Sequence, residues 1–100
     1  MSTLDPHAPT NTDRIALSNQ LYELAESFAL EATLWADAEA KLGCARSGRQ
    51  LAEVARQLIA GRADFAKAQA FADAAGLIYR NVVATRQFFT SITTQPTRGA

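Results

Sequence analysis

Few residues of this chain have the chemistry that catalysis or metal binding needs. His7 is the only histidine and Cys44 the only cysteine among 100 residues. The sequence contains no Glu-x-x-His pair and no glycine-rich phosphate loop, so the common hydrolytic, metal and nucleotide motifs have no residues from which to form. His7 lies in a polar, proline-containing terminal segment with no partner residue within reach. The sequence therefore assigns no catalytic, cofactor-binding or metal-binding residue, and it predicts no cofactor.

Carboxylates occur in close pairs at two places, Glu23 with Glu26 and Asp37 with Glu39. Such pairs are common on the solvated faces of helices. A carboxylate acts as a general acid or base only where its surroundings move its pKa toward the working pH. No sequence feature indicates a cleft that would do so. The chain is therefore not expected to be an enzyme.

Three arginines, Arg46, Arg49 and Arg56, cluster around one predicted short helix, with Arg62 just after its end. A short basic helix can contact a phosphate backbone, and this makes nucleic-acid binding one hypothesis. No aromatic side chains interleave with the arginines, however, and Glu53 stands four residues after Arg49, where the two side chains are expected to pair. We interpret the three arginines as charge-steering residues for a protein partner.

The charge distribution supports a protein partner over a nucleic acid or a membrane surface. Ten acidic residues balance ten basic residues, so the net charge is zero. Acids dominate residues 13–43, whereas bases dominate from residue 44 onward. Opposite charge on two segments favours their packing together, within one chain or between chains.

The elements that must position these side chains are helices. All three prolines lie near the termini, and the stretch between Pro9 and Pro96 is rich in alanine, leucine, glutamine, glutamate and arginine, which favour helix. The sequence predicts an all-α fold, either a helical hairpin or a three-helix bundle with two long helices and one short one. The helices are expected over about 13–42, 47–60 and 64–93 of a helical domain at 13–94, with disordered tails at 1–12 and 95–100.

Glycines and capping residues set these boundaries. Thr12 or Asp13 is expected to cap the first helix. Gly43 fits the left-handed position that ends a helix, and Gly61 does the same for the second helix. Ser47 and Gln50 have the spacing of a capping box, which predicts a helix start there. Asp64 is expected to cap the third helix, with a kink or a close helix crossing at Gly76.

The first predicted helix carries a seven-residue apolar repeat that is typical of a coiled coil. Leu21, Phe28, Trp35 and Leu42 recur at this interval, so Trp35 is expected in the core between Phe28 and Leu42. Glu31 falls on the same stripe. It is either a buried polar group that fixes register or partner, or a residue at the edge of a drifting stripe where Leu30 or Leu34 takes its place. The second interpretation is preferred.

The predicted helix lengths leave apolar surface uncovered. Helices of about thirty residues span about 45 Å, whereas the predicted middle helix spans only about 21 Å. The end of the third helix should then extend beyond the first, unless a bend at Gly76 folds it back into a closed bundle. Uncovered stripes of this kind mark interfaces. The candidate interface comprises Leu21, Phe28, Trp35, Ile78, Val82, Phe88, Phe89 and Ile92.

The compartment is constrained by one cysteine and by the absence of long apolar runs. A single cysteine cannot form an intramolecular disulfide, which favours a reducing cytoplasm, with an intermolecular Cys44 bridge as the alternative. Residues 1–13 lack the basic region and the apolar region that a secretory signal peptide has. No run approaches eighteen apolar residues, so no membrane span is expected. Export without a cleaved signal remains open.

These observations favour a cytoplasmic helical adaptor, small chaperone or assembly subunit, with a helical protein or a second copy as partner and a dimer as the expected state. A self-contained structural or regulatory bundle is the alternative, followed by nucleic-acid binding. The size and single tryptophan are similar to the WXG-type secreted helical hairpins. The segment Trp35-Ala36-Asp37 lacks the glycine and is expected inside a helix, so the chain is not assigned to that family.

Overall fold

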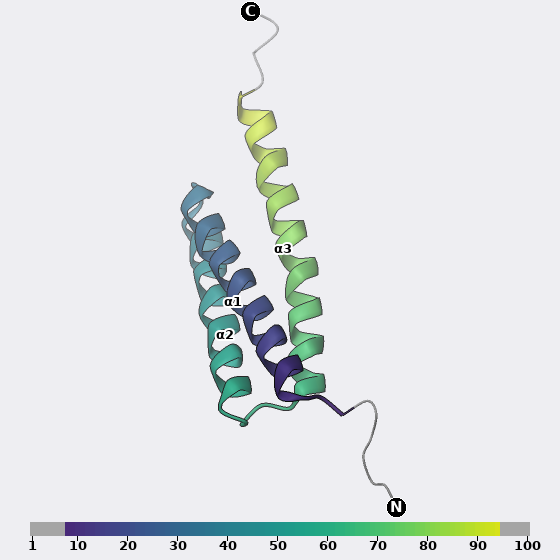
Figure 1. The fold of residues 1–100 in the computed structure, drawn as a ribbon. Coiled ribbons are helices and arrows are strands. Elements are labelled where there is room, and N and C mark those ends of the chain that lie inside the picture. The colour runs from purple at the N-terminus through teal and green to yellow at the C-terminus, as the bar shows by residue number, and fades with distance from the viewer. Residues whose placement is uncertain (1–7, 95–100) are drawn as a thin grey trace, which may run out of the picture.

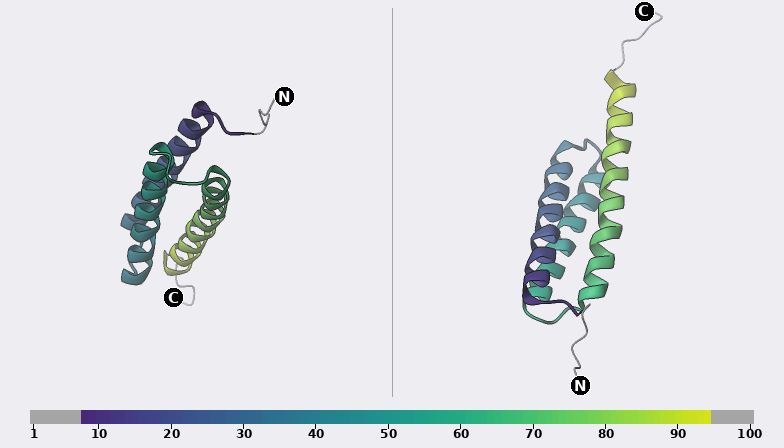
Figure 2. Two further views of the ribbon diagram at one scale, coloured as in Figure 1. Left: turned by 90° about the horizontal axis from the view of Figure 1, so that it is seen from below. Right: turned by 45° about the vertical axis from the view of Figure 1, so that its right-hand side comes forward.

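The computed structural model describes residues 8–94 of the chain as three helices, α1 (Asn11–Leu34), α2 (Ala38–Ile59) and α3 (Phe65–Thr94). α1 and α2 form an antiparallel hairpin, and α3 lies along one side of it (Figures 1 and 2). The predicted all-α fold is confirmed. Most of the two predicted disordered tails, at 1–7 and 95–100, lies outside the described residues.

Side-chain caps fix the starts of α1 and α3, and a glycine follows the end of α2. Thr10 and Asp13 form a capping box, in which Asp13 N donates to Thr10 Oγ1 at 3.1 Å and Thr10 N donates to Asp13 Oδ2 at 2.9 Å. α1 therefore begins slightly earlier than the sequence predicted. Asp64 accepts a hydrogen bond from Lys67 N at 3.0 Å and caps α3, as expected. Gly61 follows α2 with a φ of 75°, which confirms its left-handed role.

The turn between α1 and α2 lies at residues 35–37, so the predicted helix over 13–42 is wrong in its second half. Asp37 caps α2 by accepting a hydrogen bond from Ala40 N at 2.9 Å. Lys41 Nζ donates to the carbonyl oxygen of Ala32 at 3.0 Å, which satisfies a carbonyl near the end of α1. Both interactions stabilise a break that contains neither glycine nor proline. The segment that starts at Trp35 is thus at the hairpin turn, contrary to the expectation that placed it inside a helix.

α2 runs without interruption through the turn that was predicted at 43–46. Gly43 and Ser47 are helical, and the predicted capping box of Ser47 with Gln50 does not start a helix. Gly48 has a different role: a Cβ at this position would lie 3.0 Å from the carbonyl oxygen of Ala25 on α1. The close approach of the two helices therefore favours glycine at position 48. α1 and α2 have 24 and 22 residues, so the predicted short middle helix is wrong and the hairpin arms match.

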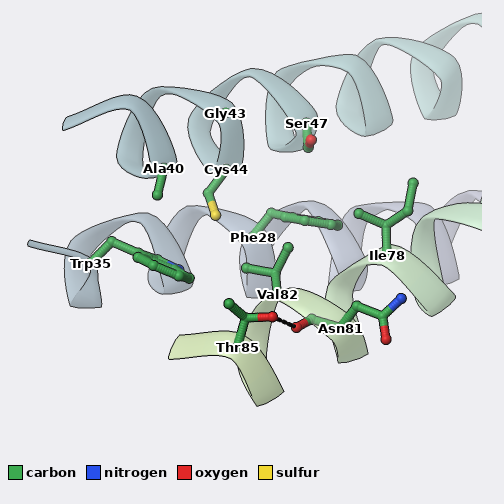
Figure 3. Close-up of a pocket in the computed structure, with 10 residues that line it drawn as sticks. All are labelled: Phe28, Trp35, Ala40, Gly43, Cys44, Ser47, Ile78, Asn81, Val82 and Thr85. Atoms are coloured by element: carbon green, nitrogen blue, oxygen red, sulfur yellow. Dashed lines mark hydrogen bonds between the residues drawn. The ribbon is translucent and has the colours of Figure 1, made fainter. Parts of the chain in front are cut away.

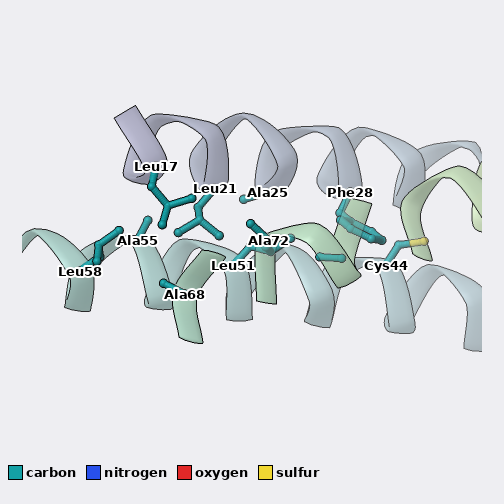
Figure 4. Packing of buried hydrophobic residues seen from close by; sticks show 11 residues of the cluster. Leu17, Leu21, Ala25, Phe28, Cys44, Leu51, Ala55, Leu58, Ala68 and Ala72 are labelled. Atoms are coloured by element: carbon teal, nitrogen blue, oxygen red, sulfur yellow. The ribbon is translucent and has the colours of Figure 1, made fainter. Parts of the chain in front are cut away.

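The core lies mainly inside the hairpin, and α3 adds a face of small residues (Figure 4). Leu21, Leu51 and Leu58 are at most 1% exposed. Buried Ser18 donates its hydroxyl to the carbonyl oxygen of Ala55 at 3.3 Å and links α1 to α2. The core cluster comprises Leu17, Leu21, Ala25, Phe28, Cys44, Leu51, Ala55, Leu58, Ala68, Ala72 and Ala75. Only alanines represent α3 in this set, so α3 is held less tightly than the hairpin arms hold each other.

α3 is continuous through Gly76, as predicted, and the alternative of a closed bundle with a bend at that position is contradicted. A Cβ at Gly76 would meet no atom within 4 Å, so no helix crosses closely there. The C-terminal end of α3 extends past the hairpin turn, as the sequence predicted (Figure 1). Val82, one of the predicted interface residues, lies beside the hairpin and is half-buried.

Candidate functional site: an apolar groove between two helices

An apolar groove of about 450 Å³ separates α2 from α3 near the hairpin turn (Figure 3). α1 provides its floor, and α2 and α3 provide its two walls. The lining residues are Phe28, Trp35, Ala40, Gly43, Cys44, Ser47, Ile78, Asn81, Val82 and Thr85. None of these side chains carries a formal charge, so the groove suits an apolar occupant.

The groove exists because the two walls differ in side-chain size. The α2 wall presents Ala40, Gly43 and Ser47, which are small and recur at intervals of three and four residues on one helix face. The α3 wall presents the larger Ile78 and Val82. A Cβ at Gly43 would meet no atom within 4 Å, which shows how open the α2 wall is. Small residues at this spacing let the backbone of another helix approach closely.

Two aromatic contacts define the floor and one end of the groove. Phe28 is buried and packs edge-on against Tyr79 of α3, with ring centroids 5.3 Å apart and an interplanar angle of 73°. Trp35 packs against Phe89 with centroids 6.4 Å apart and an angle of 68°. Both contacts hold α3 against the hairpin, one at the floor of the groove and one at its end.

Trp35 is half-buried, and its predicted place in a core between Phe28 and Leu42 is only partly correct. Leu42 lies on α2 and is 52% exposed, because the turn at 35–37 ends the seven-residue repeat. The indole Nε1 of Trp35 is enclosed and finds no hydrogen-bond acceptor among the described residues. A buried donor without an acceptor is destabilising. The same ring lines both the groove and a second pocket beside Phe89.

Glu31 is 2% exposed, and the expectation that it lies at the edge of the apolar stripe is wrong. Leu30 and Leu34, which were expected to replace it, are 63% and 52% exposed. The carboxylate of Glu31 accepts two hydrogen bonds from Arg86 of α3, one from Nε and one from Nη2, the latter at 3.2 Å. The hydrogen bond to Glu31 raises the pKa of the Arg86 guanidinium. The alternative reading of Glu31 as a buried polar group is correct, with its partner inside the chain.

Sequence reasoning missed Arg86, although one signal could have indicated it. Tyr79 and Arg86 are seven residues apart and lie on the same face of α3, toward the hairpin. A single arginine on an otherwise apolar helix face needs a carboxylate opposite it, because a buried charge must be paired. Glu31 was the matching acid on the stripe of the first predicted helix.

Cys44 is buried and lines the groove where α1 and α2 face each other (Figure 3). Burial raises the pKa of the Cys44 thiol, and the nearby negative charge of Glu31 raises it further. Both effects disfavour the thiolate, which is the reactive form. The alternative of an intermolecular Cys44 bridge does not fit this enclosed position.

The predicted interface residues fall into three groups. Leu21 and Phe28 are at most 1% exposed and belong to the core, so Leu21 cannot contact a partner in this fold and Phe28 does so only from the groove floor. Val82 and Trp35 are half-buried on the groove. The remaining four are more than half exposed, and all lie on α3: Ile78, Phe88, Phe89 and Ile92.

The three predicted charge-steering arginines, Arg46, Arg49 and Arg56, are all exposed on α2. Glu53 pairs with Arg56 at 2.5 Å, and Gln57 Nε2 donates to the same carboxylate at 3.1 Å. The predicted pairing of Glu53 with Arg49 is therefore wrong. The hydrogen bond from Arg56 lowers the pKa of the Glu53 carboxyl.

Within residues 8–94 no group of histidine, cysteine, aspartate and glutamate side chains is arranged to hold a metal ion. None of the three helices is long and apolar enough to cross a membrane. No protein-family model, no curated protein and no solved structure matches the chain.

Proposed function

We propose that this protein is a small helical interaction module that takes up an apolar helix of another protein in the groove between α2 and α3. The observation that carries the proposal is the uncharged groove of about 450 Å³ with an aromatic floor. Grooves between helices commonly receive the apolar face of an amphipathic helix. Such a module would serve as an adaptor, a small chaperone or an assembly subunit.

Three properties of the groove favour a helix as its occupant. The spacing of Ala40, Gly43 and Ser47 lets a third helix approach α2 closely, as at the crossing of Gly48 with Ala25. The exposed side chain of Ile78 stands at the edge of the groove and would be covered by that helix. The unpaired indole N–H of Trp35 would gain an acceptor if the incoming chain offered an oxygen at that end.

Filling the groove tests this proposal. Gly43→Leu places a large side chain in the open space of the α2 wall, and it also raises helix propensity, so the fold should be retained. We expect the partner that co-purifies with the tagged chain from its native cell to be lost from this variant. Gly43→Ala is the matched control, because it raises helix propensity and leaves most of the groove open. Equal recovery of the partner by Gly43→Leu and by the unchanged protein would contradict the proposal.

A further inference from the structure

α3 has a second apolar face on the side away from the hairpin. Ala68, Ala72 and Ala75 are buried against the hairpin. At 3.6 residues per turn, the opposite side of the helix carries a row of exposed residues that we term the outer face. The outer face comprises Ala66, Ala70, Ala74, Leu77, Asn81, Ala84, Phe88 and Ile92. A helix that is apolar on opposite sides is normally covered on both.

The outer face has the same spacing in both chain directions. The intervals between its eight residues are four, four, three, four, three, four and four. A two-fold axis across the helix near residue 79 therefore superposes the row on itself. This axis pairs Ala66 with Ile92, Ala70 with Phe88, Ala74 with Ala84, and Leu77 with Asn81.

We propose that two copies of this chain form a dimer in which their α3 helices pack antiparallel through the outer face. In this arrangement Phe88 and Ile92 of one copy meet the small Ala70 and Ala66 of the other. Large side chains facing small ones fill the space between two helices evenly. A parallel pair would set Phe88 against Phe88 and Ala70 against Ala70, which crowds one end and leaves a gap at the other.

Charges at one edge of the outer face agree with the antiparallel arrangement. Asp73 and Arg80 are both exposed and lie on the same edge of α3. In an antiparallel helix pair the same edges of the two copies meet. Asp73 of each copy then lies within reach of Arg80 of the other, about 8 Å away along the axis by the helical rise. No charged residue lies on the outer face itself, so its burial requires no charge to be paired.

The size of the outer face indicates a reversible dimer. The row spans 26 helical steps, or about 40 Å, and a helix about 10 Å wide thus presents roughly 400 Å² in projection. Two copies together bury about 800 Å², which is below the roughly 1,200–2,000 Å² of stable specific interfaces and in the range of weak, transient ones. The outer face shares only Asn81 with the groove lining, so the inference stands apart from the proposed function.

Disulfide trapping tests both the dimer and its direction. Two variants, Ala74→Cys and Ala84→Cys, are made in a Cys44→Ala background, and a size tag marks one of them. Paired cysteines need Cβ atoms about 4 Å apart. The antiparallel dimer brings position 74 of one copy to position 84 of the other, whereas like positions are about 15 Å apart along the helix. We therefore expect mild oxidation to cross-link the mixture and neither variant alone. Cross-links within each single variant would overturn the antiparallel arrangement.

Sedimentation measures the interface independently. Phe88→Glu places a charge at the outer face and should weaken self-association at least tenfold. Leu30→Glu is the matched control: Leu30 is 63% exposed on α1, outside the outer face, and its substitution should leave the dimer intact. Gly43→Leu should also leave the dimer intact, which separates this inference from the groove. A monomer at all concentrations, or equal loss of association in Phe88→Glu and Leu30→Glu, would overturn the proposal.

Discussion

Glu31 on α1 and Arg86 on α3 form a two-hydrogen-bond ion pair across 55 positions of the chain. Glu31 is almost fully enclosed, and the side chain of Arg86 is 21% exposed. The buried alanines of α3 have short side chains, so alanine packing alone would not fix the position of α3 along the hairpin. The ion pair has directional geometry, so it fixes how far along the hairpin α3 lies and how it is rotated.

Removing one partner of this pair should be strongly destabilising. Arg86→Met keeps much of the side-chain volume but leaves the carboxylate of Glu31 enclosed without a counter-ion. We expect the melting temperature to fall by roughly 10 to 20 °C. The double variant Glu31→Leu/Arg86→Met removes both charges and should recover most of the loss. Additive effects of the two substitutions would show that the ion pair does not act as a unit.

Glycines at three helical positions should respond differently to alanine. Gly48→Ala places a Cβ 3.0 Å from the carbonyl oxygen of Ala25, and the backbone of α1 must shift by a few tenths of an ångström to accommodate it. We expect a loss of about 1–3 kcal/mol in the free energy of unfolding. Gly43→Ala and Gly76→Ala meet no atom within 4 Å and should each stabilise the protein by up to about 1 kcal/mol. Urea denaturation checks all three, and a stabilised Gly48→Ala protein would contradict the close helix crossing.

Trp35 should tolerate phenylalanine better than alanine. Trp35→Phe keeps an aromatic ring against Phe89 and removes the unpaired indole N–H, so its effect on stability should be below about 1 kcal/mol. Trp35→Ala loses the ring contact, and since the side chain is only half-buried we expect a loss of about 2 kcal/mol. Hydrogen exchange should show weaker protection near Phe89 in Trp35→Ala alone. Equal exchange in both variants would mean that Trp35 does not secure this part of α3.

The Cys44 thiol should be unreactive until the protein opens. Its ordinary pKa of 9.0 is raised by burial, so the native state holds less thiolate than an unfolded chain at the same pH. A thiol reagent should therefore react slowly at pH 8 and rapidly in urea. Because the pKa is raised in the folded state, the thiol favours folding at low pH, and this contribution is lost as the pH rises above 9.0. Fast reaction of the folded protein would contradict the enclosed position.

The exposed arginines of α2 should serve protein contacts rather than nucleic acid. Replacing Arg46, Arg49 and Arg56 together by glutamine should barely change folding, because exposed charges contribute little to stability. The triple variant should associate with a protein partner more slowly and with weaker salt dependence. If the unchanged protein retained mixed-sequence DNA or RNA at physiological salt, and the triple variant did not, the nucleic-acid hypothesis would replace ours.

Sequence reasoning placed α3 well and the hairpin turn badly, for identifiable reasons. The predicted 64–93 agrees closely with Phe65–Thr94, because the Asp64 cap and Pro96 mark its ends. The turn at 35–37 contains no glycine or proline, and the tertiary contact of Lys41 with Ala32 cannot be read from local sequence. In the local sequence, Gly43 is as typical of a helix end as the true turn at 35–37. Only the three-dimensional path of α1 shows that Gly48 is the glycine with a structural requirement.

The candidate site could be predicted from the sequence only in part, because the hairpin turn was misplaced. Exposure of Phe88, Phe89 and Ile92 follows from the length of α3, which the sequence indicates. The groove depends on which residues of α2 face α3, and the misplaced turn prevented that assignment. Glu31 was noticed as an anomaly, but its partner lies on a different helix 55 residues away.

The short hairpin turn has a consequence for the order in which the chain folds. A connection of three residues costs little loop-closure entropy, so α1 and α2 can meet early. α3 must find the hairpin mainly through contacts with α1, which are distant in sequence. We therefore expect the hairpin to form first and the pairing of Glu31 with Arg86 to follow. For the same reason we expect α3 to be the first segment that detaches from the native protein.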